Sequence, residues 1–490
     1  MKKLNLNQRS GITYLYFAVG CLIFAYVLVR AILLDITFDE SWTLRDFVPR
    51  TILNIFRYQP CDANHHLLNT LLIKLFYAFL PHTAFVARIP NVLASILYIF
   101  FAYKICRKFC SEPIAFFSFI ILLVNPFLLD FFSQARGYGL SLGFQMGSLY
   151  YLLSYVRDAD PKDLIKMFSF SFFSVLSIFV MINFFIAEIC VVFLLSILKP
   201  TQYKLKTNII VASVFSILLA LFIYTPVTKL IASNSLYYGG NTGFYHDSLV
   251  SLMQLSLYQQ SVSSSVVYTV LNLFLIVVGV VVVLSFLHKQ KWISPKNAAV
   301  LILLLCILAV IVQFYLLGTL YLLDRAALYF YPLFIIAFAL SLNELRFVYV
   351  KNILVVLVCL AFCFNFFKNA NFYKTALFYF EAHTRDLLEL INLDGQDQQR
   401  VMKIDYSWPF ESGVQYYVVE KKHYPYVESI QNRHHRSEVN LDFDYYIYLS
   451  ESLERANYWA QYQKILEYRD SLILFKSYPH EGVLIFKQKE

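Results

Sequence analysis

Residues 35–42 read Asp35-Ile36-Thr37-Phe38-Asp39-Glu40-Ser41-Trp42, and they follow an apolar run over residues 12–34. A run of that length can cross the hydrocarbon core of a bilayer as a helix. The acidic pair Asp39-Glu40 therefore stands just past a predicted membrane span. Carboxylates at a membrane face are costly unless they do chemistry, bind an ion or pair with other groups. The sequence thus predicts a membrane scaffold that holds an acidic pair at one face.

The rest of the chain has the composition of a polytopic membrane protein. Of its 490 residues, 59% are hydrophobic and only 15% are charged, against about 25% charged in a soluble protein. Only helices fit, because lipid cannot satisfy open backbone groups and the apolar runs lack the alternation of barrel strands. We predict an all-α polytopic fold with about eleven transmembrane helices. They lie near residues 12–34, 83–105, 113–131, 137–156, 164–182, 184–199, 207–228, 264–287, 297–317, 325–342 and 349–367.

Basic residues predict the orientation of these spans. The net charge of +9 does not indicate nucleic-acid binding, because the basic residues lie in short loops between spans. Every second connection is basic, which places those loops and the N-terminus in the cytoplasm. The apolar stretch over residues 65–80 is too short for a full crossing, so we expect a helix at the outer interface. The chain after residue 369 is then extracytoplasmic, and a bacterial inner membrane is the expected location.

The sequence predicts two domains. A transmembrane domain covers residues 1–368, with a first outer loop over residues 35–82, and a small extracytoplasmic α/β domain covers residues 369–490. In the second domain charge density rises and helix-length apolar runs disappear. Its predicted strands are 414–420, 444–449, 472–476 and 483–487, the last two forming a hairpin, and an amphipathic helix fits residues 453–468.

Acidic, basic and aromatic side chains gather on the outer side of this topology. Arginine binds phosphate oxygens bidentately, and a carboxylate can take a proton from an attacking hydroxyl. A cavity that combined them would suit a phosphate-linked substrate. Structural roles stay open for the same residues: a carboxylate such as Asp130 or Asp324 can cap a helix or pair with arginine, and Arg136 and Arg325 can anchor in the interface. The residues concerned are Asp39, Glu40, His65, His66, Asp130, Arg136, Tyr138, Asp324 and Arg325.

The order of these motifs resembles the membrane glycosyltransferases of the GT-C fold, in the broad group that contains protein O-mannosyltransferases and the lipid A aminoarabinose transferase. The resemblance covers about residues 10–345. This chain has His-His-Leu-Leu where the group often has His/Lys-Pro-Pro-Leu, and Gln134 where the group usually has glutamate. The matching elements are Asp39-Glu40, Asn64-His65-His66-Leu67-Leu68, Ala87-Arg88-Ile89-Pro90-Asn91, Asn125-Pro126-Phe127, Ser133-Gln134-Ala135-Arg136-Gly137-Tyr138, and Asp324-Arg325 with Pro332.

The resemblance implies a polyprenyl-phosphate-linked sugar donor and a hydroxyl acceptor, which can be lipid, glycan or protein. Asp39 matches the catalytic aspartate of the group and would act as general base, with inversion at the anomeric carbon, while Glu40 would orient it. The lipid phosphate would be bound by His65 or His66 together with Arg88, Arg136, Tyr138 and Arg325. We predict no metal ligands among these residues; a divalent metal as cofactor stays open.

A transporter or lipid flippase without catalysis is the alternative from another functional class. Transporters place charges near the bilayer midplane and use broken helices in repeated halves. In this chain the charges cluster at one face and no internal repeat is visible. This distribution favours the enzyme.

Overall fold

The structure is a computed structural model that describes residues 6–236, 238–258, 263–287, 292–429, 443–450 and 469–489. The chain forms two compact units. The first comprises Met1–Ile32 and Arg50–Ala370, and the second comprises Leu33–Pro49 and Asn371–Glu490. The stretch with the acidic pair thus packs with the C-terminal part of the chain.

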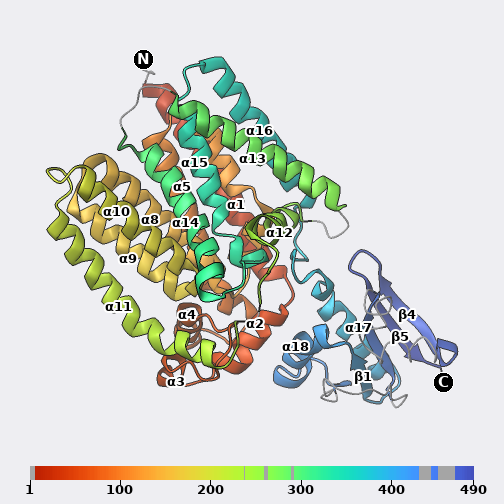
Figure 1. Ribbon diagram of the computed structural model, residues 1–490. Helices are drawn as coiled ribbons and strands as arrows, with labels where there is room; N and C mark the ends of the chain where they lie inside the picture. The colour runs from red at the N-terminus through yellow and green to blue at the C-terminus, as the bar shows by residue number, and fades with distance from the viewer. Residues whose placement is uncertain are drawn as a thin grey trace. The chain divides into compact units, whose positions relative to one another are not determined.

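The first unit is a bundle of long helices, in which α8, α9 and α10 run side by side (Figure 1). Short 3₁₀ or π-helical segments, labelled η, join several of them. Its elements are α1 (Leu6–Leu33), α3 (Ile52–Phe56), α4 (Leu67–Tyr77), α5 (Ala84–Phe109), α6 (Ile114–Leu123), α7 (Pro126–Phe132), α8 (Gly137–Asp158), α9 (Pro161–Ser177), η2 (Phe179–Met181), α10 (Ile182–Leu198), α11 (Leu205–Ala232), η3 (Phe244–Val250), α12 (Ser251–Ser256), α13 (Ser264–Phe286), α14 (Pro295–Leu317), η4 (Asp324–Ala327), α15 (Phe330–Asn343) and α16 (Val348–Asn369).

Eight helices of the described residues are long and apolar enough to cross a membrane, and α6 with α7 makes a ninth if this bent pair counts as one span. The pair is bent by 62°. Pro126 begins α7, and Asn125 before it is extended and caps the helix by accepting from the Leu128 amide at 3.1 Å. A residue before proline is pushed out of the helical region, so the predicted span 113–131 is broken.

The remaining two predicted spans are helical, but they do not meet the same standard of length and hydropathy. The span predicted at 137–156 is α8, which contains glycine, serine and glutamine, and the span at 164–182 is mainly α9, with 17 residues. The predicted helices are therefore present, while the prediction of about eleven membrane crossings exceeds the eight or nine that length and composition support in the described chain.

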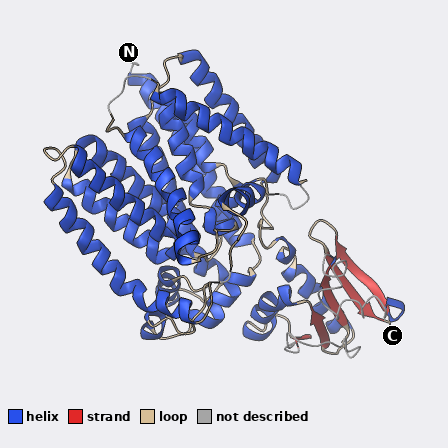
Figure 2. Ribbon diagram, viewed as in Figure 1, coloured by secondary structure: helices blue, strands red, loops and turns tan. Residues whose placement is uncertain are grey.

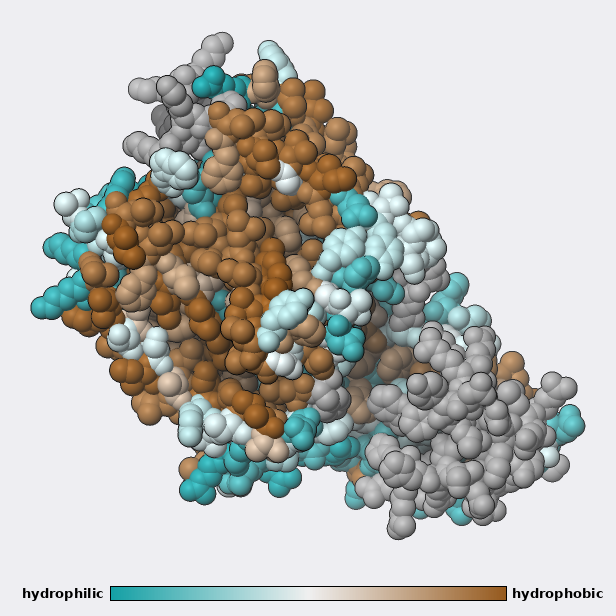
Figure 3. Space-filling view, viewed as in Figure 1, coloured by the Kyte–Doolittle hydropathy of each residue, from teal (hydrophilic) through white to brown (hydrophobic). Residues whose placement is uncertain are grey.

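Apolar side chains cover the outside of the bundle as well as its interior. In Figure 3 the middle of the visible face of the helices is almost entirely hydrophobic. Leu221 and Phe364 are each 72% exposed. A surface of this kind is stable in lipid and not in water, which supports an integral, multi-pass membrane protein.

The second unit contains the named strands of the described chain (Figure 2). They form a five-stranded sheet in the order β2-β1-β3-β5-β4, in which β1 is parallel to β2 and β3, and β5 is antiparallel to β3 and β4. Its elements are α2 (Phe38–Trp42), η1 (Thr43–Phe47), η5 (Tyr379–Glu381), α17 (Thr384–Asp397), β1 (Met402–Tyr406), η6 (Trp408–Phe410), α18 (Glu411–Val414), η7 (Gln415–Glu420), β2 (Val427–Ser429), β3 (Tyr445–Leu449), η8 (Arg469–Ser471), β4 (Leu472–Tyr478) and β5 (Val483–Gln488).

Three of the four predicted strands of this unit are confirmed, together with the hairpin. They correspond to β3, β4 and β5. The strands β4 and β5 form the antiparallel hairpin, in which Tyr478 pairs with Val483 next to the turn. The strand predicted at 414–420 is wrong, because these residues continue α18 into the π-helical segment η7. The helix predicted at 453–468 lies outside the described residues.

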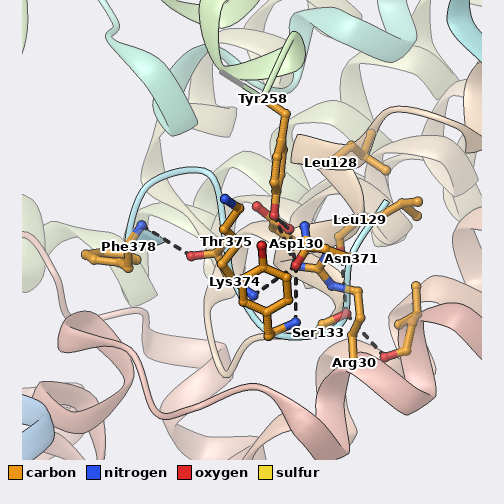
Figure 4. Close-up of polar contacts among 12 residues, drawn as sticks. Arg30, Leu128, Leu129, Asp130, Ser133, Tyr258, Asn371, Lys374, Thr375 and Phe378 are labelled. Carbon is orange, nitrogen blue, oxygen red and sulfur yellow. Dashed lines mark hydrogen bonds and ion pairs between the residues drawn. The ribbon is translucent and has the colours of Figure 1, made fainter. Parts of the chain in front are cut away.

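A buried ion pair joins α1 to α7. The guanidinium of Arg30 donates to the carboxylate of Asp130, and both side chains are almost fully buried. Figure 4 shows Tyr258 beside the pair; its hydroxyl donates to Asp130 at 2.9 Å, and Arg30 also donates to the Tyr26 hydroxyl at 2.9 Å. Asp130 therefore has the structural role that its sequence left open.

We expect Asp130→Asn to lower the free energy of unfolding by about 3–5 kcal/mol, because it leaves a buried guanidinium without its counter-charge. Asp158→Asn is the matched control, since Asp158 pairs with Arg157 where both side chains are more than 40% exposed; an exposed pair contributes about 0–1 kcal/mol. The measurement is thermal or denaturant unfolding of the purified protein in detergent. Equal effects of the two substitutions would contradict the buried-pair argument.

Candidate active site

His66 lies at the centre of a group of predicted site residues in the first unit. It precedes α4, is 6% exposed, and its ring meets Tyr138 edge to face, with 5.2 Å between ring centroids. Burial, followed by the charges of Arg136 and Arg325, holds the pKa of His66 well below its ordinary value. Four of the residues predicted from sequence therefore converge.

The neutral ring of His66 has one occupied and one available nitrogen. The His66 ring forms a hydrogen bond with the backbone of Ser177, and this bond raises the pKa of His66. A hydrogen bond that favours the protonated imidazole is one in which the ring N–H donates. Nε2 is buried and has no hydrogen-bond partner among the described residues. An imidazole that donates through Nδ1 carries a lone pair on Nε2. His66 thus offers an acceptor for a hydroxyl or amide proton.

Arg136 is fixed beside this ring by the loop before α4. It is the N-cap residue of α8 and is 1% exposed. Its guanidinium donates to the Asn64 carbonyl at 3.2 Å and also to the Asn64 side chain. The Asn64-His65-His66 and Arg136-Gly137-Tyr138 motifs, about 70 residues apart, are therefore one local structure.

Gly137 permits this close approach. A Cβ atom at residue 137 would lie 2.2 Å from the Ser177 carbonyl oxygen and 3.0 Å from the Cβ of His66. The first distance excludes a side chain, because the carbonyl oxygen is held by backbone, and the second is a tight contact. The glycine of this motif is thus needed to place the imidazole.

Arg325 completes the group from η4. Its guanidinium carbon lies 6.0 Å from the ring centroid of Tyr138 and 5.5 Å from that of Tyr238. The Tyr238 hydroxyl donates to Asp324. Burial, followed by the Asp324 charge, raises the pKa of Tyr238. Arg325 therefore lies against two aromatic faces, an arrangement that orients a guanidinium. Tyr238 is not predictable from the sequence, because a single tyrosine in a loop belongs to no motif.

His65 is buried against a different neighbour. Its ring stacks on Tyr58 with centroids 4.5 Å apart, and the Tyr58 hydroxyl donates to its carbonyl at 2.6 Å. Burial lowers the pKa of His65 to about 4. Both histidines are consequently neutral at pH 7, and Arg136 and Arg325 provide positive charge beside His66.

Acidification is expected to destabilise the first unit through His65. The pKa of His65 is 6.5 in the unfolded chain and about 4 in the folded protein. Between these two pH values the unfolded chain binds more protons at His65 than the folded chain does. The stabilisation that is present above pH 6.5 is therefore lost as the pH falls. His65→Gln should reduce the decrease in melting temperature between pH 7 and pH 5. The exposed His82, stacked on Tyr77, provides the control His82→Gln. An unchanged pH dependence in His65→Gln would refute this assignment.

Arg88 and its neighbours have contacts that hold helices together. The Arg88 guanidinium, 1% exposed, donates to the Ala31 carbonyl of α1 at 3.1 Å. One turn further along α5, Asn91 donates to Asn69 at 2.9 Å and accepts from the Leu140 amide at 3.0 Å. These contacts give Arg88 a structural role, while its predicted binding of lipid phosphate stays a prediction.

The acidic pair lies in the second unit, on α2. Asp39 is the second residue of this helix and is 6% exposed. The Glu40 carboxylate accepts from the Thr37 amide at 3.0 Å and the Thr37 hydroxyl at 3.1 Å, which closes the first turn as in a capping box. The two acids thus have different roles: Glu40 stabilises the helix start, and Asp39 remains the candidate base.

Three further contacts fix residues 33–49 within the second unit. The Asp35 carboxylate pairs with Arg385 of α17, and burial raises its pKa despite that pair. The Ser41 hydroxyl donates to the Ser412 carbonyl at 2.6 Å, and the Ile36 amide donates to the Tyr417 hydroxyl at 3.0 Å. Among the described residues, no group of three or more His, Cys, Asp or Glu side chains is placed to hold a metal ion.

Comparison with known proteins places this fold. Residues 64–228 match the family model of dolichyl-phosphate-mannose-protein mannosyltransferase, a range that contains His65, His66, Arg88, Arg136 and Tyr138. The structure of ArnT from Cupriavidus metallidurans bound to undecaprenyl phosphate is similar with a TM-score of 0.53 and 11% identity, over 97% of this chain and 98% of that chain. The chain is a membrane protein with the fold of ArnT, a GT-C fold.

Two other solved structures are similar to this chain with lower TM-scores. The arabinosyltransferase EmbB from Mycobacterium smegmatis gives a TM-score of 0.43 at 10% identity, over 70% of this chain and 31% of that chain. The oligosaccharyltransferase from Archaeoglobus fulgidus, in complex with Zn and sulfate, gives 0.47 at 13% identity, over 90% and 69%. No curated protein sequence matches the chain significantly. The GT-C fold that the motifs predict is therefore confirmed by the similarity to ArnT.

Proposed function

We propose that this GT-C protein transfers a sugar from a polyprenyl-phosphate carrier to a hydroxyl acceptor on the outer side of a bacterial inner membrane. The observation that carries the proposal is the convergence of Arg136 and Arg325 on the neutral His66 and on Tyr138. Two guanidinium groups suit a phosphate, and the imidazole and phenol suit sugar hydroxyls. The undecaprenyl phosphate bound to the similar ArnT supports a carrier of this class.

In the reaction, the acceptor oxygen attacks the anomeric carbon and the bond from that carbon to the phosphate oxygen breaks. The electron pair of that bond leaves on the polyprenyl phosphate, and the hydroxyl proton goes to Asp39. Guanidinium groups stabilise the charge that develops on the leaving phosphate, so a separate general acid is not required. Direct displacement inverts the configuration at the anomeric carbon.

The test uses the purified full-length protein in nanodiscs with a panel of undecaprenyl-phosphate monosaccharides, each carrying a radiolabelled sugar, and with a cell-envelope extract as source of acceptors. Transfer releases undecaprenyl phosphate and moves the label to a second product, whose anomeric configuration is then determined. Movement of intact donor across a vesicle bilayer without release of lipid phosphate would support the flippase alternative and reject the enzyme.

The orientation has its own test. We place the N-terminus in the cytoplasm and the second unit outside, as the basic loops predict. Cysteine substitution of Lys403 in the second unit, followed by labelling of intact cells with a membrane-impermeant maleimide, should modify that residue. Labelling only after membrane disruption would reverse the orientation and remove the proposed outer location of the reaction.

A further inference from the structure

Glu381 contacts the start of the helix that bears Asp39. It ends η5, in the segment that follows the last long helix, and is 1% exposed. Its Oε2 accepts a hydrogen bond of 2.8 Å from the backbone amide of Phe38, the first residue of α2. Glu381 is anchored in turn by Thr384, whose hydroxyl donates to its carbonyl at 2.9 Å. One oxygen of this carboxyl therefore fixes the position of α2.

The other oxygen is buried and available. Oε1 of Glu381 has no hydrogen-bond partner among the described residues. It faces α18 at Gly413, where a Cβ atom would lie 3.8 Å away. A buried polar atom that makes no hydrogen bond costs about 1–3 kcal/mol. Glu381 already stabilises α2 through Oε2, so this cost at Oε1 is not needed for the fold. It indicates that Oε1 has a functional role.

Negative charge surrounds this carboxyl. Burial, followed by the charges of Asp39, Glu40 and Asp35, raises the pKa of Glu381 well above its ordinary value. Arg385 of α17, four residues along the chain, pairs with Asp35, and Glu411 is the titratable residue of α18. Neighbouring carboxyl groups with different environments divide into one that keeps its proton and one that is ionised.

We propose that Glu381 is a positioning residue for Asp39: it holds the start of α2 through Oε2 and offers a hydrogen-bond donor at the buried Oε1. This inference rests on the proposed function. When Glu381 ionises as the pH rises, its donor is lost and a further negative charge repels Asp39. Sugar transfer should therefore fall on the alkaline side through the ionisation of Glu381.

Two substitutions separate this role from simple packing. Glu381→Gln stays neutral at every pH and keeps both an acceptor and a donor, so kcat at pH 7 should remain within about threefold of the unaltered protein and the alkaline decrease should disappear. Glu381→Leu removes both hydrogen bonds and should lower kcat by about tenfold or more, which corresponds to about 1.4 kcal/mol. Glu428→Gln, at an exposed position of β2, is the control and should reproduce the unaltered pH profile.

The assay follows release of undecaprenyl phosphate from the donor panel described above, between pH 6 and pH 10. An alkaline limb that persists in Glu381→Gln, or an equal loss in the Gln and Leu variants, would overturn the proposal. Infrared spectroscopy at pH 7 provides a readout independent of sugar transfer: the band of protonated carboxyl groups should be weaker in Glu381→Gln than in the unaltered protein. If no sugar is transferred, the proposed function fails, while equal bands in the two proteins reject the state assigned to Glu381.

Discussion

Asp39→Asn is expected to abolish sugar transfer while the protein remains folded. General-base assistance contributes about 10²–10⁴-fold to a reaction of this kind, and an amide of the same shape cannot accept the proton. The decrease should appear in kcat, because in the proposed mechanism the donor phosphate is bound by arginines and Asp39 only takes the proton. The measurement is label transfer from the undecaprenyl-phosphate monosaccharide that the unaltered protein uses.

The structure explains why this substitution should leave α2 intact. The start of the helix is held by Glu40, by Glu381 and by the contact of Ser41 with Ser412, and none of these bonds uses the Asp39 carboxylate. The melting temperature should therefore change little, which separates loss of chemistry from loss of folding. Glu40→Gln should lower stability more than catalysis. The Thr37 amide and hydroxyl donate to the Glu40 carboxylate, and hydrogen bonds to a charged acceptor are stronger than those to a neutral amide.

Asp46→Asn is the matched control, since Asp46 belongs to the same segment, pairs with Arg45 at 3.0 Å and is 27% exposed. It should retain full activity. Near-normal transfer by Asp39→Asn would show that the proton goes elsewhere and that the acidic pair is structural. An equal loss of sugar transfer in Asp39→Asn and Asp46→Asn would instead show that any change of charge in this segment lowers activity.

The membrane helices were predictable because each one is a long apolar run, and lipid leaves the backbone no alternative to a helix. The break between α6 and α7 was less evident, although Asn125-Pro126 contains the physical cause. In the second unit the β-branched and aromatic residues of 414–420 predicted a strand. Tertiary contacts override that preference, because the consecutive residues Tyr416, Tyr417 and Val418 are all buried, and this burial does not follow the alternation of a strand exposed on one face.

The grouping of the candidate residues was predictable where they share a motif or one end of the bundle. His66, Arg136, Tyr138 and Arg325 come from three separate segments, and the order of the motifs was enough to group them. Glu381 could not be found in this way, because its partner Phe38 is 343 positions away and a single glutamate after a span has no pattern of its own. The protonation of His66 also depends on the fold, since burial and two arginines remove a charge that the residue type alone would allow.

Arg325→Gln is expected to lower kcat by about 10²–10³-fold, the usual effect of removing one donor that stabilises developing charge. Arg325 lies against the rings of Tyr138 and Tyr238, and a cation–π contact of this kind contributes only about 0.5–2 kcal/mol. Its removal should therefore affect the chemistry more than the stability. Because charge accumulates on the phosphate only as the bond to the sugar breaks, kcat should change more than KM.

Two further variants identify the kind of interaction. Arg325→Lys keeps the charge but loses the planar fork that matches phosphate, so its activity should lie between those of the Gln variant and the unaltered protein. Arg157→Gln removes an exposed arginine that pairs with Asp158 and should have no effect on transfer. If Arg325→Gln reduced only the protein level in the membrane and left kcat unchanged, Arg325 would be an interfacial anchor, and phosphate binding would rest on Arg136 alone.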